Sequence, residues 1–140
     1  MPSVAHETLV DLTKNWIEKE YNGIDGQIAV DGDTLGDTKP VRIEGFVPDL
    51  FCYFPKTNHT IIADAKTPKD LENPHTAAQL KAYLRYLMLL NGTTEIIIAT
   101  RHRWAPSAKS LLRSIAKNLE SEDTINKRPE LTVISELDGL

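Results

Sequence analysis

Residues 45–66 constrain the fold of this chain more than any other stretch. They contain two runs rich in β-branched and aromatic residues, separated by a short polar segment at positions 55–59. This pattern predicts a β-hairpin. Asp49 stands at the start of the first run, and the second run ends in Asp64-Ala65-Lys66. Asp49 therefore lies at the open end of the first strand, and Asp64 and Lys66 lie at the open end of the second strand.

The geometry of such a hairpin gathers these side chains. Residues two apart in a strand point to the same side, so Asp64 and Lys66 share a face while Ala65 points away. Antiparallel pairing across the turn places Asp49 opposite the end that carries Asp64 and Lys66. Two carboxylates and an ammonium group are thus expected to converge, and we expect a divalent cation there.

This set of groups suits metal-assisted hydrolysis of a phosphodiester. Mg²⁺ takes oxygen ligands and keeps several waters, so Asp49, Asp64 and the backbone carbonyl of Ala65 suffice to hold it. The metal lowers the pKa of a bound water and neutralises charge on the phosphate. Lys66 would orient or deprotonate the attacking water and stabilise the anionic transition state.

Pro48-Asp49, fourteen intervening residues and Asp64-Ala65-Lys66 resemble the signature of the PD-(D/E)XK nuclease superfamily. Three letters, D-x-K, occur by chance in many proteins, but their place at the end of an apolar β run after Pro-Asp strengthens the match. The resemblance implies a restriction-endonuclease-like α/β/α sandwich with a central mixed β-sheet. It also implies Mg²⁺ as the cofactor, with Mn²⁺ as a substitute.

Each of these residues also has a structural interpretation. Asp49 after Pro48 can be a turn residue that starts a strand. Asp64 follows an apolar run, and its burial requires a partner, which Lys66 can supply as a structural ion pair.

Residues 3–21 are predicted to form a helix, with Ser3 as its N-cap and Asn22-Gly23 at its end. Members of the superfamily often supply an acidic residue from this helix to the metal site, and some supply a histidine instead. The resemblance therefore implicates Glu7 or His6, and we favour Glu7 as a catalytic and metal-binding residue. A solvated glutamate and a core histidine are the structural alternatives.

The clearest helix is predicted at residues 75–90, where leucines and Met88 form one apolar stripe. Gln79 and Tyr83 are four residues apart and lie together on a flank of that stripe. Gln-x-x-x-Tyr after the D-x-K strand is similar to the pattern of the RecB-like branch. The resemblance implies that Gln79 assists catalysis and that Tyr83 contacts nucleic acid.

The remaining elements are a strand at residues 27–30, a buried strand at 94–100, a helix at 107–119 and a last strand at 131–134. A strand-helix-strand order from Asp64 to Thr100 implies a parallel crossover. The whole order predicts an α/β fold, with residues 1–140 as a single domain.

Residues 101–117 carry five lysines or arginines and no acid, which makes them the one basic segment of a chain with net charge −4. A basic segment that contains a tryptophan is a candidate for contacting phosphates and bases. The candidate nucleic-acid contacts are Arg101, Arg103, Trp104, Lys109 and Arg113, together with Lys69 from the polar connection after the hairpin. A solvated helix face with a core tryptophan is the alternative.

Composition limits the class of protein. A single cysteine, Cys52, excludes a disulfide framework and suits a reducing cytoplasm. No apolar stretch reaches the roughly 20 residues of a membrane span. The negative net charge is unfavourable for a nucleic-acid binder, so positive charge must be local or binding must depend on metal.

These observations predict a metal-dependent nuclease that acts on DNA, most simply an endonuclease. An exonuclease of the RecB-like type and a non-catalytic DNA-binding or regulatory subunit with the nuclease fold remain the alternatives. A chain of 140 residues offers little surface to a duplex, so a homodimer or a targeting partner protein is expected.

Overall fold

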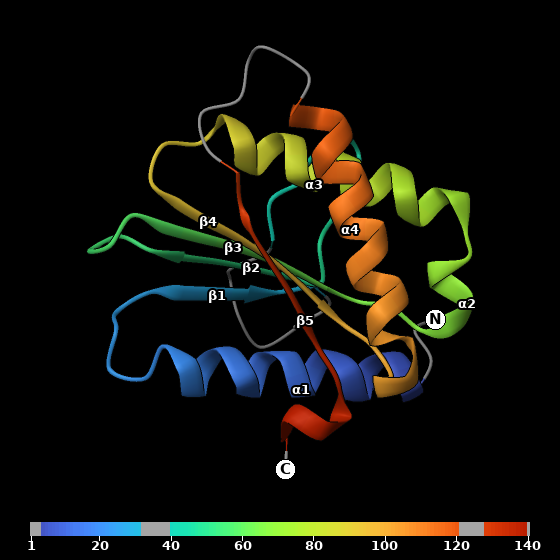
Figure 1. Cartoon of the computed structure of the whole chain (residues 1–140). Coiled ribbons are helices and arrows are strands. Elements are labelled where there is room, and N and C mark those ends of the chain that lie inside the picture. Colours follow the sequence, from blue (N-terminus) through green and yellow to red (C-terminus); the bar gives the residue numbers. More distant parts are fainter. Residues whose placement is uncertain (1–3, 32–39, 121–127, 140) are drawn as a thin grey trace.

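Five strands form one mixed sheet in the order β1-β2-β3-β4-β5 (Figure 1). The computed structural model describes residues 4–31, 40–120 and 128–139. The strands are β1 (Gln27–Val30), β2 (Leu50–Phe54), β3 (His59–Ala65), β4 (Thr93–Ala99) and β5 (Glu130–Ile134). The first three strands pair antiparallel, whereas β3, β4 and β5 run parallel.

Helices cover both faces of this sheet (Figure 1). The described residues form four α-helices, which are α1 (Val4–Glu20), α2 (Pro68–Leu71), α3 (Pro74–Leu89) and α4 (Ala105–Glu120), and two short 3-10 helices, η1 (His102–Trp104) and η2 (Glu136–Gly139). The helix α1 lies on one face, and α3 and α4 lie on the other. The predicted α/β class and mixed sheet are confirmed.

Alternation along the central strands divides the core into two parts. Ile61 and Ile97 pack with residues of α1, whereas Ile62, Ile96 and neighbouring side chains pack with α3 and α4. Because both faces of β3 and β4 are buried, these strands carry continuous apolar runs instead of a polar alternation.

The predicted hairpin is present with the predicted register. Leu50 pairs with Ala63 and Phe54 with His59, across a turn at residues 55–58. One step beyond the last pair, Asp49 comes opposite Asp64. The expectation that Asp49 lies opposite the Asp64-Ala65-Lys66 end of the second strand is therefore confirmed.

The strand β2 begins five residues later than the predicted run, which starts at Gly45. The other predicted helices and strands agree with the observed ones to within about two residues at each end, while the Ser3 cap lies outside the described residues. A short helix, α2, was not predicted. The hydroxyl of Thr67 accepts a hydrogen bond from the backbone N of Asp70, whose carboxylate accepts one from the backbone N of Thr67. This capping box with Pro68 at the first turn is a known helix start, so the polar connection after β3 begins with a helical turn.

Several elements meet at one edge of the sheet, where the central strand β3 ends. The strand β3 ends at this edge and the antiparallel strand β2 begins there. The first turn of α1 and the start of α4 lie at the same side of the molecule (Figure 1). Among the described residues, none of the helices has the length and apolar character that crossing a membrane would require.

Candidate functional site

Asp64, Lys66 and Gln79 meet on the α3 side of the sheet edge. Strand alternation places Asp64 on the same face as Ile62, which packs against α3. The Nζ of Lys66 lies 3.1 Å from Oδ2 of Asp64 and donates a short hydrogen bond to Oε1 of Gln79. The side chains of Lys66 and Asp64 are only 10% and 3% exposed. These three residues, predicted from separate parts of the sequence, therefore form one connected group.

Asp49 is joined to this group through reciprocal hydrogen bonds. Its backbone N donates to Oδ1 of Asp64 over 2.8 Å, and its own Oδ2 accepts from the backbone N of Ala65, also over 2.8 Å. The N–H and C=O of one residue in an antiparallel ladder face the same neighbour, so the Ala65 carbonyl faces the Asp49 side as well. Both carboxylates are held in fixed orientations, and Asp49 keeps Oδ1 as a further acceptor.

The helix α1 supplies His6 to this site, and Glu7 does not take that place. Nε2 of His6 lies 3.1 Å from Oδ2 of Asp49. Glu7 is exposed. Adjacent helical residues point about 100° apart, so the first turn of α1 directs only one of the two toward Asp49. His6, the alternative named with Glu7, is therefore the residue of α1 that contacts Asp49, and the preference for Glu7 as a catalytic and metal-binding residue gains no support from its exposed position.

The ionisation of the site reflects its burial. Burial raises the pKa of the Asp64 carboxyl, and the nearby Asp49 carboxylate raises it further, while the Lys66 ammonium group acts in the opposite direction. The hydrogen bond to Asp49 raises the pKa of the His6 imidazole, against the opposing effect of burial. A buried carboxyl with a specific charged partner is a typical feature of functional sites.

Tyr83 lies one helical turn beyond Gln79, but its side chain is fully buried. The prediction that Tyr83 contacts nucleic acid is therefore wrong, since no surface of its ring is available to a base. Its hydroxyl is buried as well, and it interacts with the side chain of Gln79. Burial raises the pKa of this hydroxyl, and so does the charge of Asp64.

The donor set determines which metal the site could accept. In residues 4–31, 40–120 and 128–139, no three His, Cys, Asp or Glu side chains are grouped so as to hold a metal ion. A cation here would rely on the two carboxylates and the Ala65 carbonyl, with water or phosphate oxygens as its other ligands. That incomplete oxygen shell fits Mg²⁺, which keeps several waters, and does not fit a closed structural zinc site.

The other predicted nucleic-acid contacts lie outside the carboxylate group. Exposed side chains are those of Lys69 on α2, Arg101 and Arg103 around η1, and Lys109 and Arg113 on α4, whereas Trp104 is half-buried. The sequence identified these basic residues, but residue order alone does not give their distance from the carboxylates.

A search against protein-family models, curated proteins and solved structures finds no match for this chain.

Proposed function

We propose that this protein is a magnesium-dependent nuclease of the PD-(D/E)XK type that hydrolyses DNA phosphodiester bonds, acting as an endonuclease. The observation that carries the proposal is the connected group of Asp49, Asp64, Lys66 and Gln79 at one sheet edge. Asp49 directly precedes β2, Asp64 lies in the next strand, β3, and Gln79 comes from a helix that follows them. The resemblance implies this order. The α/β/α layering with a central mixed sheet is compatible with the restriction-endonuclease-like fold.

Burial argues against a purely structural role for these charges. Replacing a buried ion pair by apolar side chains is often neutral or stabilising, so a structural purpose alone gives little reason for two carboxylates at this edge. Both carboxylates also meet where a strand ends, at a sheet edge to which helices contribute residues. Binding and catalytic sites of α/β folds are commonly found at such edges.

The chain's own residues have distinct roles in this proposal. Asp49 and Asp64, with the Ala65 carbonyl, would hold Mg²⁺, and His6 orients the Asp49 carboxylate through its hydrogen bond. A bound Mg²⁺ supplies charge neutralisation at the phosphate and a more acidic water.

In this proposal Lys66 acts on the nucleophile. An ammonium group has three donors, and two are directed at Asp64 and Gln79. The third remains for an attacking water or a phosphate oxygen. Gln79 fixes the direction of the ammonium group, so that this third donor points to a defined place.

Nicking of supercoiled plasmid in the presence of Mg²⁺ or Mn²⁺ tests the proposal. Wild-type protein should convert supercoiled to open-circular DNA, and Lys66→Ala should not. Lys19→Ala removes an exposed lysine at the far end of α1 from His6 and serves as the matched control, which should nick at close to the wild-type rate. Absence of nicking by the wild type with either metal would remove the endonuclease proposal.

The same variants separate the exonuclease alternative. An exonuclease requires ends, so it would degrade linear DNA and leave the closed plasmid intact. Activity on both substrates supports the endonuclease.

A further inference from the structure

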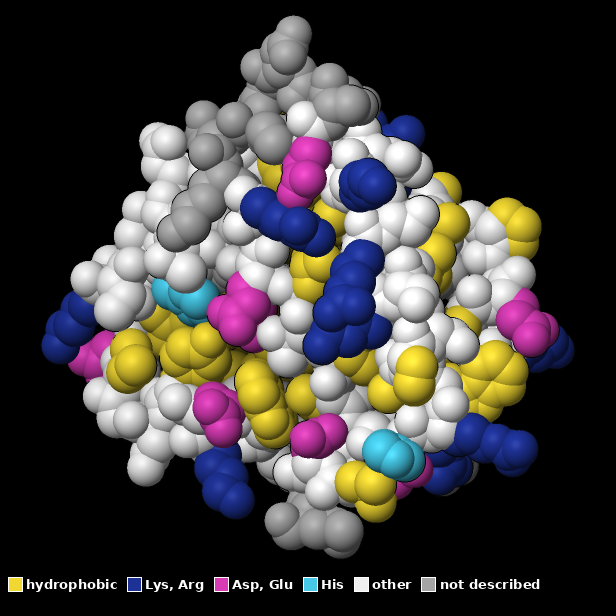
Figure 2. All heavy atoms as spheres, in the orientation of Figure 1, with side chains coloured by type: hydrophobic (Ala, Val, Ile, Leu, Met, Phe, Trp, Pro, Cys, Tyr) yellow, Lys and Arg dark blue, Asp and Glu magenta, His cyan; other side chains and the backbone are white. Residues whose placement is uncertain are grey.

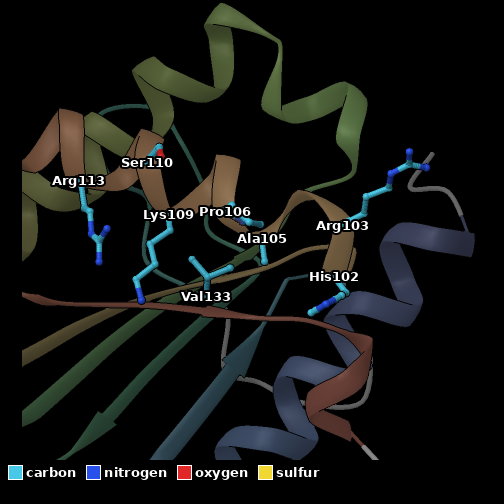
Figure 3. Close-up of a pocket in the computed structure, with 8 residues that line it drawn as sticks. All are labelled: His102, Arg103, Ala105, Pro106, Lys109, Ser110, Arg113 and Val133. Atoms are coloured by element: carbon cyan, nitrogen blue, oxygen red, sulfur yellow. The ribbon is translucent and has the colours of Figure 1, made fainter.

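An open groove of about 610 Å³ lies between α4 and β5, apart from the carboxylate group (Figure 3). The residues that line it are His102, Arg103, Ala105, Pro106, Lys109, Ser110, Arg113 and Val133. Lys109 and Arg113 extend from α4 toward β5, whereas Arg103 points away from them at the η1 end (Figure 3). The groove thus has a basic wall along α4.

The charge of this groove contrasts with that of the whole chain. None of its lining residues is acidic, although the chain carries a net charge of −4. The carboxylate of Glu136 lies near one end, where its Oε2 accepts a hydrogen bond from the backbone N of His102. On this face Figure 2 shows Lys and Arg side chains over α4 and β5, with Asp and Glu side chains beside some of them. The positive charge needed by a polyanion binder is therefore local.

The cationic side chains form a line. Lys109, Arg113 and Lys117 are exposed and spaced four residues apart, so they follow one side of α4 over about 12 Å. A row of cations along a helix fits a ligand with a charge at every unit of its chain.

The row leads away from the candidate site. Ala65 pairs with Ala99 at the end of β4, and the chain reaches η1 and then α4 within six residues of Ala99. The helix α4 consequently starts at the sheet edge that holds Asp64 and runs back over the sheet. The η1 end of the row is therefore the end nearer to the carboxylates.

We infer that the groove between α4 and β5 binds the phosphodiester backbone of a nucleic-acid strand whose scissile bond lies at the Asp49–Asp64 edge. This inference rests on the proposed function and adds the path of the substrate. Lys109 and Arg113 suit phosphate oxygens, which carry no sequence information, so these contacts are independent of sequence.

The salt dependence of DNA binding tests this path. Binding of a fluorescent 30-mer duplex is measured by anisotropy in EDTA, over a range of KCl concentrations, so that no cleavage occurs. Each lost phosphate contact lowers the slope of log K against log salt by about 0.9 on duplex DNA. Lys109→Ala/Arg113→Ala should therefore lower it by about 1.8. The matched control is Lys19→Ala/Lys81→Ala, which removes the same charge from exposed positions on α1 and α3.

A shallower slope in the groove variant alone supports the inference. An unchanged slope, an equal loss in both double variants, no binding by the wild type, or displacement of DNA by polyglutamate as readily as by unlabelled DNA would each overturn it. The last outcome would assign the groove to acidic polypeptides. Circular dichroism of both variants checks that they are folded.

Plasmid nicking by the same proteins distinguishes the two proposals. Groove-dependent binding without nicking by the wild type contradicts the nuclease proposal and with it the scissile bond at the Asp49–Asp64 edge, and it supports only the part of the inference that places a phosphodiester backbone in the groove. Nicking by the wild type, together with a salt slope that the groove substitutions leave unchanged, contradicts only the groove inference.

Discussion

The ammonium nitrogen of Lys66 lies 3.1 Å from Oδ2 of Asp64, and both side chains are almost wholly removed from solvent. A pair of this kind gives little net stability, because removing two charges from water offsets their attraction. Loss of one partner has a large effect, because the other charge is left buried. The pair therefore makes both the activity and the stability of the protein sensitive to single substitutions.

Lys66→Ala should lower the free energy of unfolding at pH 8 by about 3–5 kcal/mol, because it leaves Asp64 buried without its cation. The loss should be smaller at pH 5, where Asp64 can bind a proton. Urea titrations at both pH values measure the difference. Lys66→Ala/Asp64→Asn should recover part of the loss, and a single variant no less stable than the exposed-lysine variant Lys69→Ala would contradict the prediction.

Wild-type stability should fall as the pH rises from about 5 to 8. The raised pKa of Asp64 means that the folded carboxyl binds its proton more tightly than the unfolded one, so unfolding becomes easier as the pH rises above about 4. The raised pKa of His6 has the same sign, because its contribution is present below about pH 6.5 and is lost as the pH rises through the folded value.

Asp64→Asn isolates the carboxyl part of this effect. The stability of Asp64→Asn relative to wild type should increase with pH between 5 and 8, since the other titrating groups largely cancel in the difference. Urea titrations of both proteins at four pH values provide the measurement. A difference that stays constant over this range would mean that Asp64 keeps an ordinary pKa.

The sequence was sufficient for the parts of the site that depend on strand periodicity. Alternation along β3 puts Asp64 and Lys66 on one face, and hairpin register puts Asp49 opposite them, so these relationships follow from local rules. The choice between His6 and Glu7 could not be made in this way, because it depends on how α1 is rotated against the sheet. The burial of Tyr83 likewise depends on tertiary packing, which a flank position on a helix does not reveal.

Magnesium should stabilise the protein at pH 8. For a site with a Kd of about 1 mM, about 10 mM Mg²⁺ adds about 1.4 kcal/mol to the free energy of unfolding. The increase should be smaller at pH 5, because a proton on Asp64 competes with the cation. Asp49→Asn/Asp64→Asn should abolish the effect, and an equal rise in thermal midpoint for this variant would show that Mg²⁺ binds elsewhere.

His6→Ala and Glu7→Ala should differ in their effect on nicking. His6 bonds to the Asp49 carboxylate that would hold the metal, and loss of such a supporting hydrogen bond typically lowers activity about 10- to 100-fold. Glu7 is exposed in the same turn, so Glu7→Ala should change the rate by about twofold or less. Initial rates of plasmid nicking at saturating Mg²⁺ and at about 0.5 mM Mg²⁺ provide the comparison. The His6→Ala defect should be larger at the lower metal concentration, because a misoriented Asp49 binds the cation more weakly. A larger loss of activity in Glu7→Ala than in His6→Ala would instead indicate that Glu7 acts at the site.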